Sequence, residues 1–355
     1  MTNIYGKTHK PSAELQQGVK YILTNCDTGR NITVEGNKLF AFENGGFVIG
    51  EYTCKLIPLC NSRYKLEVEN GFLKDDDKGE CSCASLSVET EEPTVIECCW
   101  YATEDGKAEP LRLMFVGDSI TLGANTDVPE EEWWGCRPDV TRLIGNDPEN
   151  RFVSVGSMKA NQSYEDETML FRHEGHGGWM AVDIWGKFYG RWEEDRGLAS
   201  FMEGWMLKYK PDTIMIQLGT NDTAFASGRD PQHQGAWTEE GMQGVFDRYV
   251  TLYDIFWRVN PDIEIVIATA PPTTRSDVFQ EWLVEFNRRL VILVEKWKEE
   301  GKKVLFANTF DAIWNADPHH GLCSDHVHLS WAGYHAMAGV YYKKFLELYP
   351  DGVGK

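Results

Sequence analysis

The sequence predicts an α/β fold of three layers, in which a parallel sheet lies between two layers of helices. Five short apolar runs carry this prediction, at 111–117, 152–155, 213–218, 263–268 and 304–307. Helical patterns fill the intervals between them. Strands that alternate with helices pair in parallel, and their nearly continuous apolar character indicates burial on both faces. The pattern favours a flavodoxin-like, five-stranded parallel sheet.

The first of these strands ends in Gly117-Asp118-Ser119, after which a polar, glycine-containing segment begins. A buried parallel strand delivers the residues that follow it to the carboxyl edge of the sheet, where such folds place their active sites. Ser119 is therefore a candidate nucleophile. Because a serine hydroxyl is unreactive alone, a base, an orienting acid and an oxyanion hole must come from elsewhere in the chain.

The remaining strands each follow a turn or helix end, such as Lys210-Pro211-Asp212 and Asn260-Pro261-Asp262. The helical patterns between them are centred on five segments, near 133–145, 197–209, 240–258, 277–300 and 331–347. We find no internal repeat and no low-complexity tract.

The sequence pattern of residues 1–105 predicts an all-β domain, either a small sandwich or a jelly roll. Seven runs of β-branched and aromatic residues lie between turn signals: 19–24, 31–35, 38–42, 46–50, 64–68, 84–89 and 94–101. A sugar-binding or docking role is one interpretation, but no pattern identifies a ligand, so a structural or oligomerisation role is favoured. The charged segment 103–110 ends in proline and predicts a linker to a second domain, 106–355.

Composition excludes several classes of partner. The chain has 355 residues and a formal net charge of −20, which disfavours binding to nucleic acid and to anionic membranes. No run of 18 or more apolar residues predicts a membrane span. The first eleven residues lack the apolar core of a signal peptide, so we expect a protein that is cytoplasmic, exported by another route or carried on a virion.

Nine cysteines include at least one that is unpaired in any monomer, and seven of them precede residue 100. Cys81-Ser82-Cys83 and Cys98-Cys99 do not repeat the C-x-x-C spacing of zinc sites. We expect reduced and mostly buried thiols.

Two further segments offer groups that stabilise an oxyanion. The strand at 213–218 is followed by Gly219-Thr220-Asn221-Asp222, and the Asn221 amide can donate a hydrogen bond. The segment 172–179 is rich in glycine, which lets backbone N–H groups approach a substrate oxygen. A metal site on His173 and His176 is the alternative for this segment, but a third ligand is lacking and the string is not H-E-x-x-H.

The base is expected late in the chain, where Asp325 and His328 are separated by two residues and can share one short turn. The carboxylate would then bind Nδ1, and Nε2 would face the serine. The pair Asp317 and His320 has the same spacing, and His326 is also near, so spacing alone does not choose among them. A helix start at Ser330 favours Asp325 and His328.

These four segments, in this order, resemble the blocks of the SGNH (GDSL) hydrolase superfamily over residues 111 to about 348, and the closer match resembles its acetyl xylan esterases. The resemblance implies Ser119 as nucleophile, His328 as base and Asp325 as its partner. It implies an oxyanion hole of the Ser119 and Gly178 backbone N–H groups and the Asn221 side chain, with no metal or organic cofactor. The family usually has glycine after the aspartate and proline after the histidine; here these positions hold His326 and Leu329.

The resemblance implies an acylated carbohydrate as the substrate. An exposed subset of the tryptophans would suit a sugar, although a packing role is favoured for any single tryptophan except Trp179. Twelve of the thirteen tryptophans follow residue 105, and those on predicted loops or helix starts are Trp133, Trp134, Trp179, Trp185 and Trp237. Trp179, Arg137 and His176 are the predicted substrate-binding residues. Arg137 and Arg172 could bind a substrate carboxylate or sugar hydroxyls, and pairing with the many surface acids is the alternative for both.

The function expected from these features is a serine esterase that removes acetyl groups from a carbohydrate. A lipase, a thioesterase or a sialic-acid O-acetylesterase on the same fold is the alternative among enzymes. A phage or cell-surface structural protein that carries this domain is the alternative of another class, with oligomer or particle association through residues 1–105.

Overall fold

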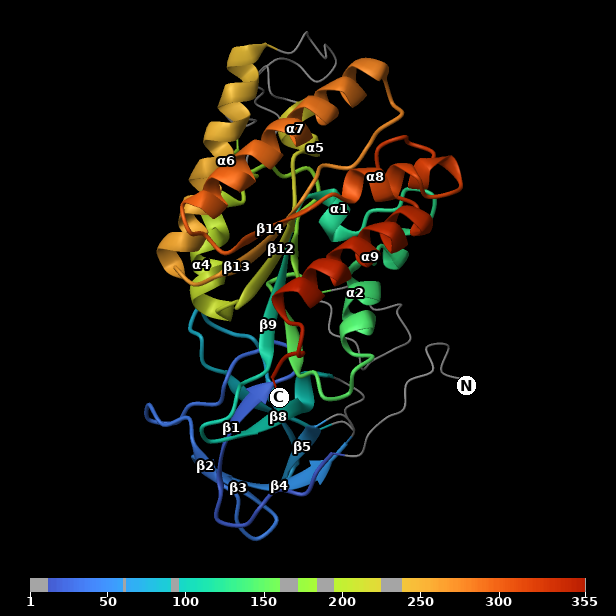
Figure 1. Ribbon diagram of the computed structural model, residues 1–355. Coiled ribbons are helices and arrows are strands. Elements are labelled where there is room, and N and C mark those ends of the chain that lie inside the picture. The colour runs from blue at the N-terminus through green and yellow to red at the C-terminus, as the bar shows by residue number, and fades with distance from the viewer. Residues whose placement is uncertain are drawn as a thin grey trace.

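The computed structural model describes residues 12–59, 62–90, 96–159, 172–183, 195–224 and 238–354. Two sheets organise these residues (Figure 1). An antiparallel sheet is built from strands before residue 105, and a parallel sheet with its helices is built from residue 111 onward.

The parallel sheet has the strand order β10-β9-β12-β13-β14, and neighbouring strands pair in parallel. Its strands are β9 (Leu111–Gly117), β10 (Phe152–Val155), β12 (Thr213–Gln217), β13 (Glu264–Ala268) and β14 (Val304–Ala307). The five predicted strands are therefore confirmed. A two-residue strand that the sequence did not indicate, β11 (Glu174–Gly175), pairs with the end of β9.

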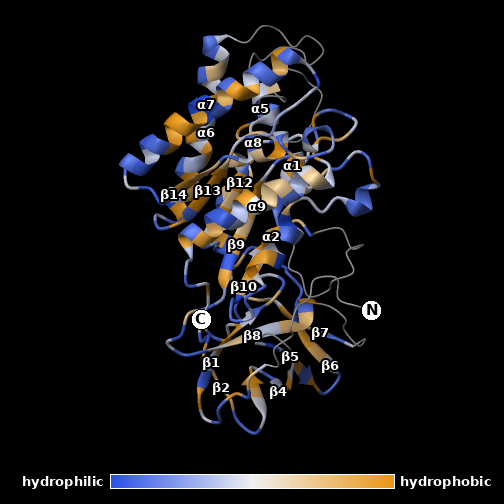
Figure 2. Ribbon diagram, turned by 45° about the vertical axis from the view of Figure 1, so that its right-hand side comes forward, coloured by the Kyte–Doolittle hydropathy of each residue, from blue (hydrophilic) through white to orange (hydrophobic). Residues whose placement is uncertain are grey.

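Helices cover both faces of this sheet. They are α1 (Ser119–Leu122), α2 (Arg137–Ile144), α4 (Ala199–Tyr209), α5 (Thr220–Ala224), α6 (Glu239–Val259), α7 (Asp277–Glu299), α8 (Thr309–Trp314) and α9 (Trp331–Leu348), with short 3₁₀ helices at Ile96–Cys98, Glu130–Glu132 and His319–Gly321. Alternate residues of β9 point to opposite sides. Met114 packs in the core beneath α4, α6 and α7, whereas Phe115 packs in the core beneath α2, α8 and α9. Figure 2 shows the hydrophobic character of the central strands.

The antiparallel sheet contains β1 (Lys20–Asn25), β2 (Phe40–Ala41), β3 (Gly46–Ile49), β4 (Tyr52–Pro58), β5 (Arg63–Val68), β6 (Gly71–Asp75), β7 (Leu86–Glu89) and β8 (Cys99–Glu104). The prediction of an all-β region is confirmed. These strands join into one hydrogen-bonded sheet, whereas the sequence predicted the two sheets of a sandwich or jelly roll. The predicted strand 31–35 is wrong, because Asn31 and Val34 make only isolated bridges.

The two sheets share a core. Cys26, Cys99 and Tyr101 belong to the same buried cluster as Met114 and Val153 of the parallel sheet. The predicted linker is a strand end followed by a short connection, since Thr103 and Glu104 lie in β8 and β9 begins at 111. Hydrogen bonds from Arg151 to Thr103 and Ala108 fasten this connection.

The cysteines within the described ranges are free thiols, and most of them are buried, as expected. Among the helices of the same ranges, none is long and apolar enough to span a bilayer.

Candidate active site

Ser119 stands immediately beyond the carboxyl end of β9. Asp118 caps the short helix α1 that begins at Ser119, because its Oδ1 accepts a hydrogen bond from the Ile120 N–H at 2.9 Å. Gly117 permits the close approach of the neighbouring strand: a Cβ there would lie 1.9 Å from the Gln217 carbonyl oxygen. Ser119 is thereby presented at the sheet edge, and its side chain is partly exposed.

His328 faces this serine from the loop that precedes α9. His328 Nε2 lies 2.9 Å from Ser119 Oγ, and His328 Nδ1 lies 2.5 Å from Asp325 Oδ2. Asp325 Oδ1 accepts hydrogen bonds from the backbone N–H groups of Val327 and His328, both at 3.0 Å. The three side chains that the sequence favoured thus form one hydrogen-bonded chain.

The Asp325 carboxylate is held in its ionised form. Burial opposes ionisation, but the hydrogen bonds from His328 and from the backbone outweigh it and lower the pKa of Asp325 below its ordinary value. An ionised carboxylate on Nδ1 fixes the imidazole tautomer that leaves Nε2 free to accept a proton from the serine hydroxyl.

The other histidines considered as bases point elsewhere. His320 Nδ1 lies 2.8 Å from the Trp314 carbonyl oxygen, and its ring stacks on Trp314 with centroids 4.0 Å apart. His326 Nδ1 lies 2.9 Å from Thr274 Oγ1. Among the histidines of the described ranges, only His328 is hydrogen-bonded to Ser119, so the geometry favours it as the base.

His326 stands where the resemblance leads us to expect glycine, and it adopts a backbone conformation that is typical of glycine. His326 has φ +65°, a left-handed conformation that glycine adopts most readily. Its carbonyl oxygen accepts hydrogen bonds from Thr273 Oγ1 at 2.6 Å and from the Thr274 N–H at 3.1 Å, which hold the residue in this conformation. Leu329, in the place of the usual proline, is fully buried.

The glycine-rich segment lies against the Ser119 turn. Gly175 pairs with Gly117, and the His176 N–H donates to the Gly117 carbonyl oxygen at 3.0 Å. Asn221, at the start of α5, donates from Nδ2 to the Trp179 carbonyl oxygen at 3.0 Å, which ties it to the residue after Gly178. The three elements of the predicted oxyanion hole therefore meet at one edge of the sheet.

Two fully buried carboxyl groups lie under these loops. Asp118 adjoins Ser119, and Asp222 accepts a hydrogen bond from the Ala181 N–H at 3.1 Å. Burial, together with the nearby Asp222 carboxyl group, raises the pKa of Asp118 to about 7. Burial likewise raises the pKa of Asp222 to about 6. Both groups face the protein interior, which suits bracing rather than chemistry.

The three predicted substrate-binding residues lie in two different environments: His176 and Trp179 are in an aromatic stack, whereas Arg137 is buried. His176 and Trp179 stack with ring centroids 4.3 Å apart, and Trp205 stacks on the His176 ring with centroids 5.0 Å apart. Arg137 is 1% exposed, and its Nη1 donates to the Thr121 carbonyl oxygen. In this conformation Arg137 supports α1 from inside the protein and is not brought to the open side of Ser119.

Other predicted residues also have clear positions. The Trp133 Nε1–H donates to the Asn125 carbonyl oxygen at 2.9 Å, and Trp134 packs against Trp331. Trp185 and Trp237 lie outside the described residues.

The pair considered for a metal is occupied by protein contacts. His173 is buried, and its Nδ1 accepts a hydrogen bond from the Gly175 N–H at 3.0 Å. His176 Nε2 lies 3.0 Å from Glu174 Oε2. Within the ranges that the structure describes, no group of three or more His, Cys, Asp or Glu side chains is placed to hold a metal ion.

Sequence reasoning missed Glu174, which is fully buried beside the site. Its carboxylate accepts hydrogen bonds from the Ser157 N–H at 2.5 Å and from Ser157 Oγ at 2.7 Å, in addition to its contact with His176. A carboxylate between two histidines in a glycine-rich string was the available signal.

A cavity of about 660 Å³ opens beside the loop that carries Asp325 and His328, which we call the acid–base loop. Its lining carries many hydrogen-bonding groups: Asp127, Thr274, His319, His320, Leu322, Cys323, Ser324 and His326. Ser324 and His326 flank Asp325 in the sequence, so the cavity lies beside the loop that carries Asp325, while Ser119 and His328 are not among its lining residues.

A comparison with known families identifies the parallel-sheet region. Residues 115–336 match the model of the GDSL-like Lipase/Acylhydrolase family. The chain belongs to this family. Its members are acylhydrolases, so the chain is classed with the carboxylic-ester hydrolases, as the sequence motifs predicted.

Solved structures and one curated relative are also similar. The family 3 carbohydrate esterase of Clostridium thermocellum superposes with a TM-score of 0.51 at 22% identity, over 68% of this chain and 97% of that one. A family 3 carbohydrate esterase from Talaromyces cellulolyticus gives a TM-score of 0.49 at 24% identity, over 68% and 99%. The first of these supports the fold.

The curated relative comes from Acetivibrio thermocellus and is named "Putative endoglucanase X". It is 22% identical over 151 residues, which cover 42% of this chain and 57% of the relative. The match thus spans little more than half the length of that protein.

Proposed function

We propose that the protein is a serine esterase that removes acyl groups, chiefly acetyl, from a carbohydrate. The observation that carries the proposal is the chain from Ser119 Oγ to His328 Nε2 at 2.9 Å and from His328 Nδ1 to Asp325 at 2.5 Å. This is the arrangement that turns a serine hydroxyl into a nucleophile.

In the proposed reaction Ser119 Oγ attacks the ester carbonyl carbon while His328 Nε2 takes the hydroxyl proton. The Ser119 and Gly178 N–H groups and the Asn221 amide stabilise the negative oxygen of the tetrahedral intermediate. His328 then returns the proton to the leaving sugar oxygen, which leaves an acyl group on Ser119. Water, deprotonated by His328, releases the carboxylic acid and restores the serine.

The surroundings of Ser119 support a sugar as the alcohol part of the ester. The stacked rings of His176, Trp179 and Trp205 adjoin the proposed oxyanion donors, and aromatic faces of this kind pack against sugar rings. The hydrogen-bonding groups of the neighbouring cavity, among them His319 and His320, suit sugar hydroxyls. The carbohydrate esterase names of the similar structures agree with this substrate class.

We also propose that the chain is organised into two domains. Residues 106–355 form the catalytic domain with flavodoxin-like layering, and residues 1–105 form a domain that supports it. Association with a particle or a second copy through residues 1–105 stays a prediction, which the sedimentation behaviour of the purified protein would test.

Replacing Ser119 with alanine tests the proposed nucleophile. We expect kcat/KM for an aryl acetate to fall by about 10⁴-fold or more, because the mutant cannot form the acyl-enzyme. The circular dichroism spectrum and thermal midpoint should stay near those of the wild type, since the side chain is small and partly exposed. A mutant that kept most of its activity would refute the assignment.

A series of esters with lengthening acyl chains tests the acyl specificity. A steep loss of kcat/KM beyond acetate supports a deacetylase, whereas an increase toward long chains supports the lipase alternative. Released acetate from a panel of acetylated glycans would then identify the sugar.

A further inference from the structure

The antiparallel sheet contacts the oxyanion loop, which we define as residues 173–179, through one buried arginine. Arg172 directly precedes this loop and is 2% exposed. Its Nε and Nη2 donate to the two carboxylate oxygens of Asp27 at 2.8 and 2.6 Å, and its Nη1 donates to Asp77 Oδ2 at 2.6 Å. Asp27 follows β1 and Asp77 follows β6, so both acids come from the antiparallel sheet.

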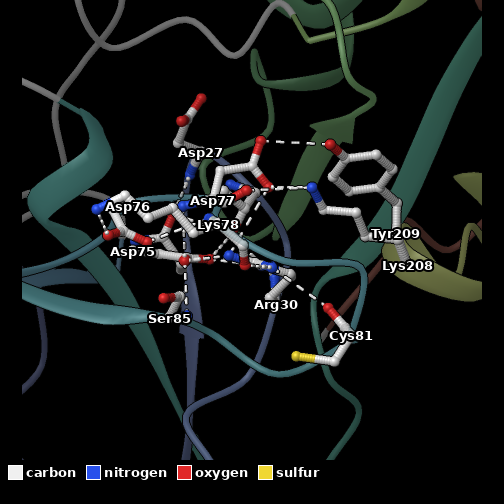
Figure 3. A network of polar contacts seen from close by, with 12 residues as sticks. Asp27, Arg30, Asp75, Asp76, Asp77, Lys78, Cys81, Ser85, Lys208 and Tyr209 are labelled. Carbon is white, nitrogen blue, oxygen red and sulfur yellow. Dashed lines mark hydrogen bonds and ion pairs between the residues drawn. The ribbon is translucent and has the colours of Figure 1, made fainter.

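Asp77 is itself fixed from a second direction. Lys208 Nζ lies 3.0 Å from Asp77 Oδ1, and the Tyr209 hydroxyl donates to Asp77 Oδ2 at 3.3 Å. Figure 3 shows Lys208 and Tyr209 reaching Asp77 from the end of α4. The backbone of Asp77 has φ +57°, a conformation that costs energy for a residue other than glycine and persists where the surroundings impose it.

Arg30 and Asp75 complete the network on the side of the antiparallel sheet. Arg30 Nε donates to Asp75 Oδ2 at 2.8 Å, and Thr28 Oγ1 donates to the same oxygen at 2.6 Å. The network then holds three cations and three carboxylates, contributed by Arg30, Arg172, Lys208, Asp27, Asp75 and Asp77. A balanced set of buried charges is stable only while each partner stays in place.

Hydrogen bonds of the backbone connect Arg172 to the candidate active site. The Arg172 carbonyl oxygen accepts a hydrogen bond from Ser154 Oγ at 2.7 Å. His173 exchanges two backbone hydrogen bonds with Met158, both at 3.1 Å. Gly175 then pairs with Gly117, two residues before Ser119. Five residues separate Arg172 from Gly178, the proposed oxyanion donor.

We propose that Asp27 and Asp77 are positioning residues of the esterase, which set the place of the oxyanion loop through Arg172. The inference rests on the proposed function and adds a role for the antiparallel sheet. Oxyanion donors stabilise charge that develops in the transition state, so a displaced donor lowers kcat more than it raises KM.

The test is the variant Asp27→Asn. Asparagine keeps the shape of the aspartate side chain but loses the negative charge that binds Arg172. We expect kcat for an aryl acetate to fall about tenfold with KM within threefold of wild type. The pH midpoint of kcat/KM should not move, because His328 and Asp325 stand on a separate loop. Arg172→Lys keeps the positive charge but loses the guanidinium that binds both carboxylate oxygens of Asp27, so it should likewise lower kcat with little change in KM. The double variant Asp27→Asn/Arg172→Lys should lose no more kcat than the more impaired of the two single variants.

Glu109→Gln is the matched control. Glu109 pairs with Arg112 at 3.0 Å and with Lys38, so it too joins the two sheets, but Arg112 lies at the opposite end of β9 from Ser119. Its kcat should stay within twofold of wild type.

Three results would overturn the inference: a normal kcat in folded Asp27→Asn, an equal loss in Glu109→Gln, or multiplied losses in the double variant. These results are distinct from failure of the proposed function itself, in which Ser119→Ala would remain active.

Discussion

His326 shows how a single backbone conformation shapes the proposed acid–base loop. It stands between Asp325 and His328 with φ +65°, and hydrogen bonds from Thr273 and Thr274 to its carbonyl oxygen hold it there. The requirement of this position is a left-handed backbone and not an imidazole.

Replacing His326 with glycine should therefore preserve activity, with kcat within about threefold of wild type. Valine at the same position should lower stability by about 1–2 kcal/mol, because a β-branched side chain disfavours positive φ. His328→Ala should lose about 10⁴-fold in kcat/KM. Steady-state assays and thermal unfolding of the three variants check this. A large loss in the glycine variant would show that the His326 ring is required.

Asp118 makes the stability of the molecule depend on pH. Its carboxyl group is fully buried, and its Oδ2 has no hydrogen-bond partner among the described residues. Burial raises its pKa to about 7 from an ordinary value of 3.8. Between these two values the unfolded chain releases the proton while the folded protein keeps it, so the contribution of Asp118 to stability is full below pH 4 and is lost as pH rises toward 7.

Asp118→Asn removes this titration and keeps the acceptor for the Ile120 N–H. Relative to wild type, the variant should gain stability between pH 4 and pH 7, by up to about 4 kcal/mol for a shift of this size. Urea unfolding of both proteins at pH 4.5, 6 and 8 measures the difference. Parallel pH dependences would contradict the raised pKa.

At the scale of elements, the two-residue strand β11 packs closely against α1. A Cβ on Gly175 in β11 would lie 2.4 Å from the Leu122 backbone nitrogen, whereas one on Gly177 would lie 3.6 Å from the end of the Leu122 side chain. The two glycines are separated by one residue, so they form a matched pair for mutation.

Gly175→Ala should displace α1 or β11 and reduce kcat by at least about tenfold, because Ser119 begins α1. Gly177→Ala should leave kcat within about twofold. Kinetics with an aryl acetate, alongside circular dichroism to confirm folding, separates the two. Equal behaviour of the two variants would show that the contact with α1 is unimportant.

The sequence predicts the long helices and central strands well. The predicted segments 240–258 and 277–300 correspond to α6 and α7, because each has a long amphipathic pattern after a Thr or Ser cap. The strands β4 and β6 were missed because their residues are mostly half-exposed and mix charged with apolar side chains. Two-residue β11 gives no periodic signal at all.

The candidate site likewise has residues that the sequence predicts and residues whose positions it does not predict. Asp325 and His328 are close in sequence, so their shared turn could be predicted from spacing, and Ser119 follows from the end of a strand. The burial of Arg172 could not be predicted, because its partners Asp77 and Asp27 lie 95 and 145 residues away. The burial of Arg137 under α1 likewise depends on packing between distant segments.

The whole molecule has a core that crosses from one sheet to the other. Cys26, Cys99 and Tyr101 pack with Met114 and Val153, and the loop at Gly29 approaches Val155 so closely that a Cβ would lie 2.7 Å from it. Residues 106–355 expressed alone would expose this apolar surface and leave Arg172 without Asp27 and Asp77.

We expect such a truncated protein to be insoluble or to unfold at a temperature at least about 10 °C below that of the full chain, because buried apolar area and paired charges are lost together. Thermal unfolding of any soluble fraction measures this. A truncated protein with the stability and activity of the full chain would contradict the shared core.

The charged network at Arg172 also constrains how this chain can diverge or be recombined. A carboxylate lost at Asp27 or Asp77 removes one of the two carboxylate partners of the buried Arg172 guanidinium in another part of the chain, so substitutions on the two sides have to change together. A chimera that joins residues 1–105 of one relative to the esterase region of another would inherit mismatched halves of this network. Crossovers that keep Asp27, Asp77, Arg172 and Lys208 from one parent are the ones that should yield folded, active proteins.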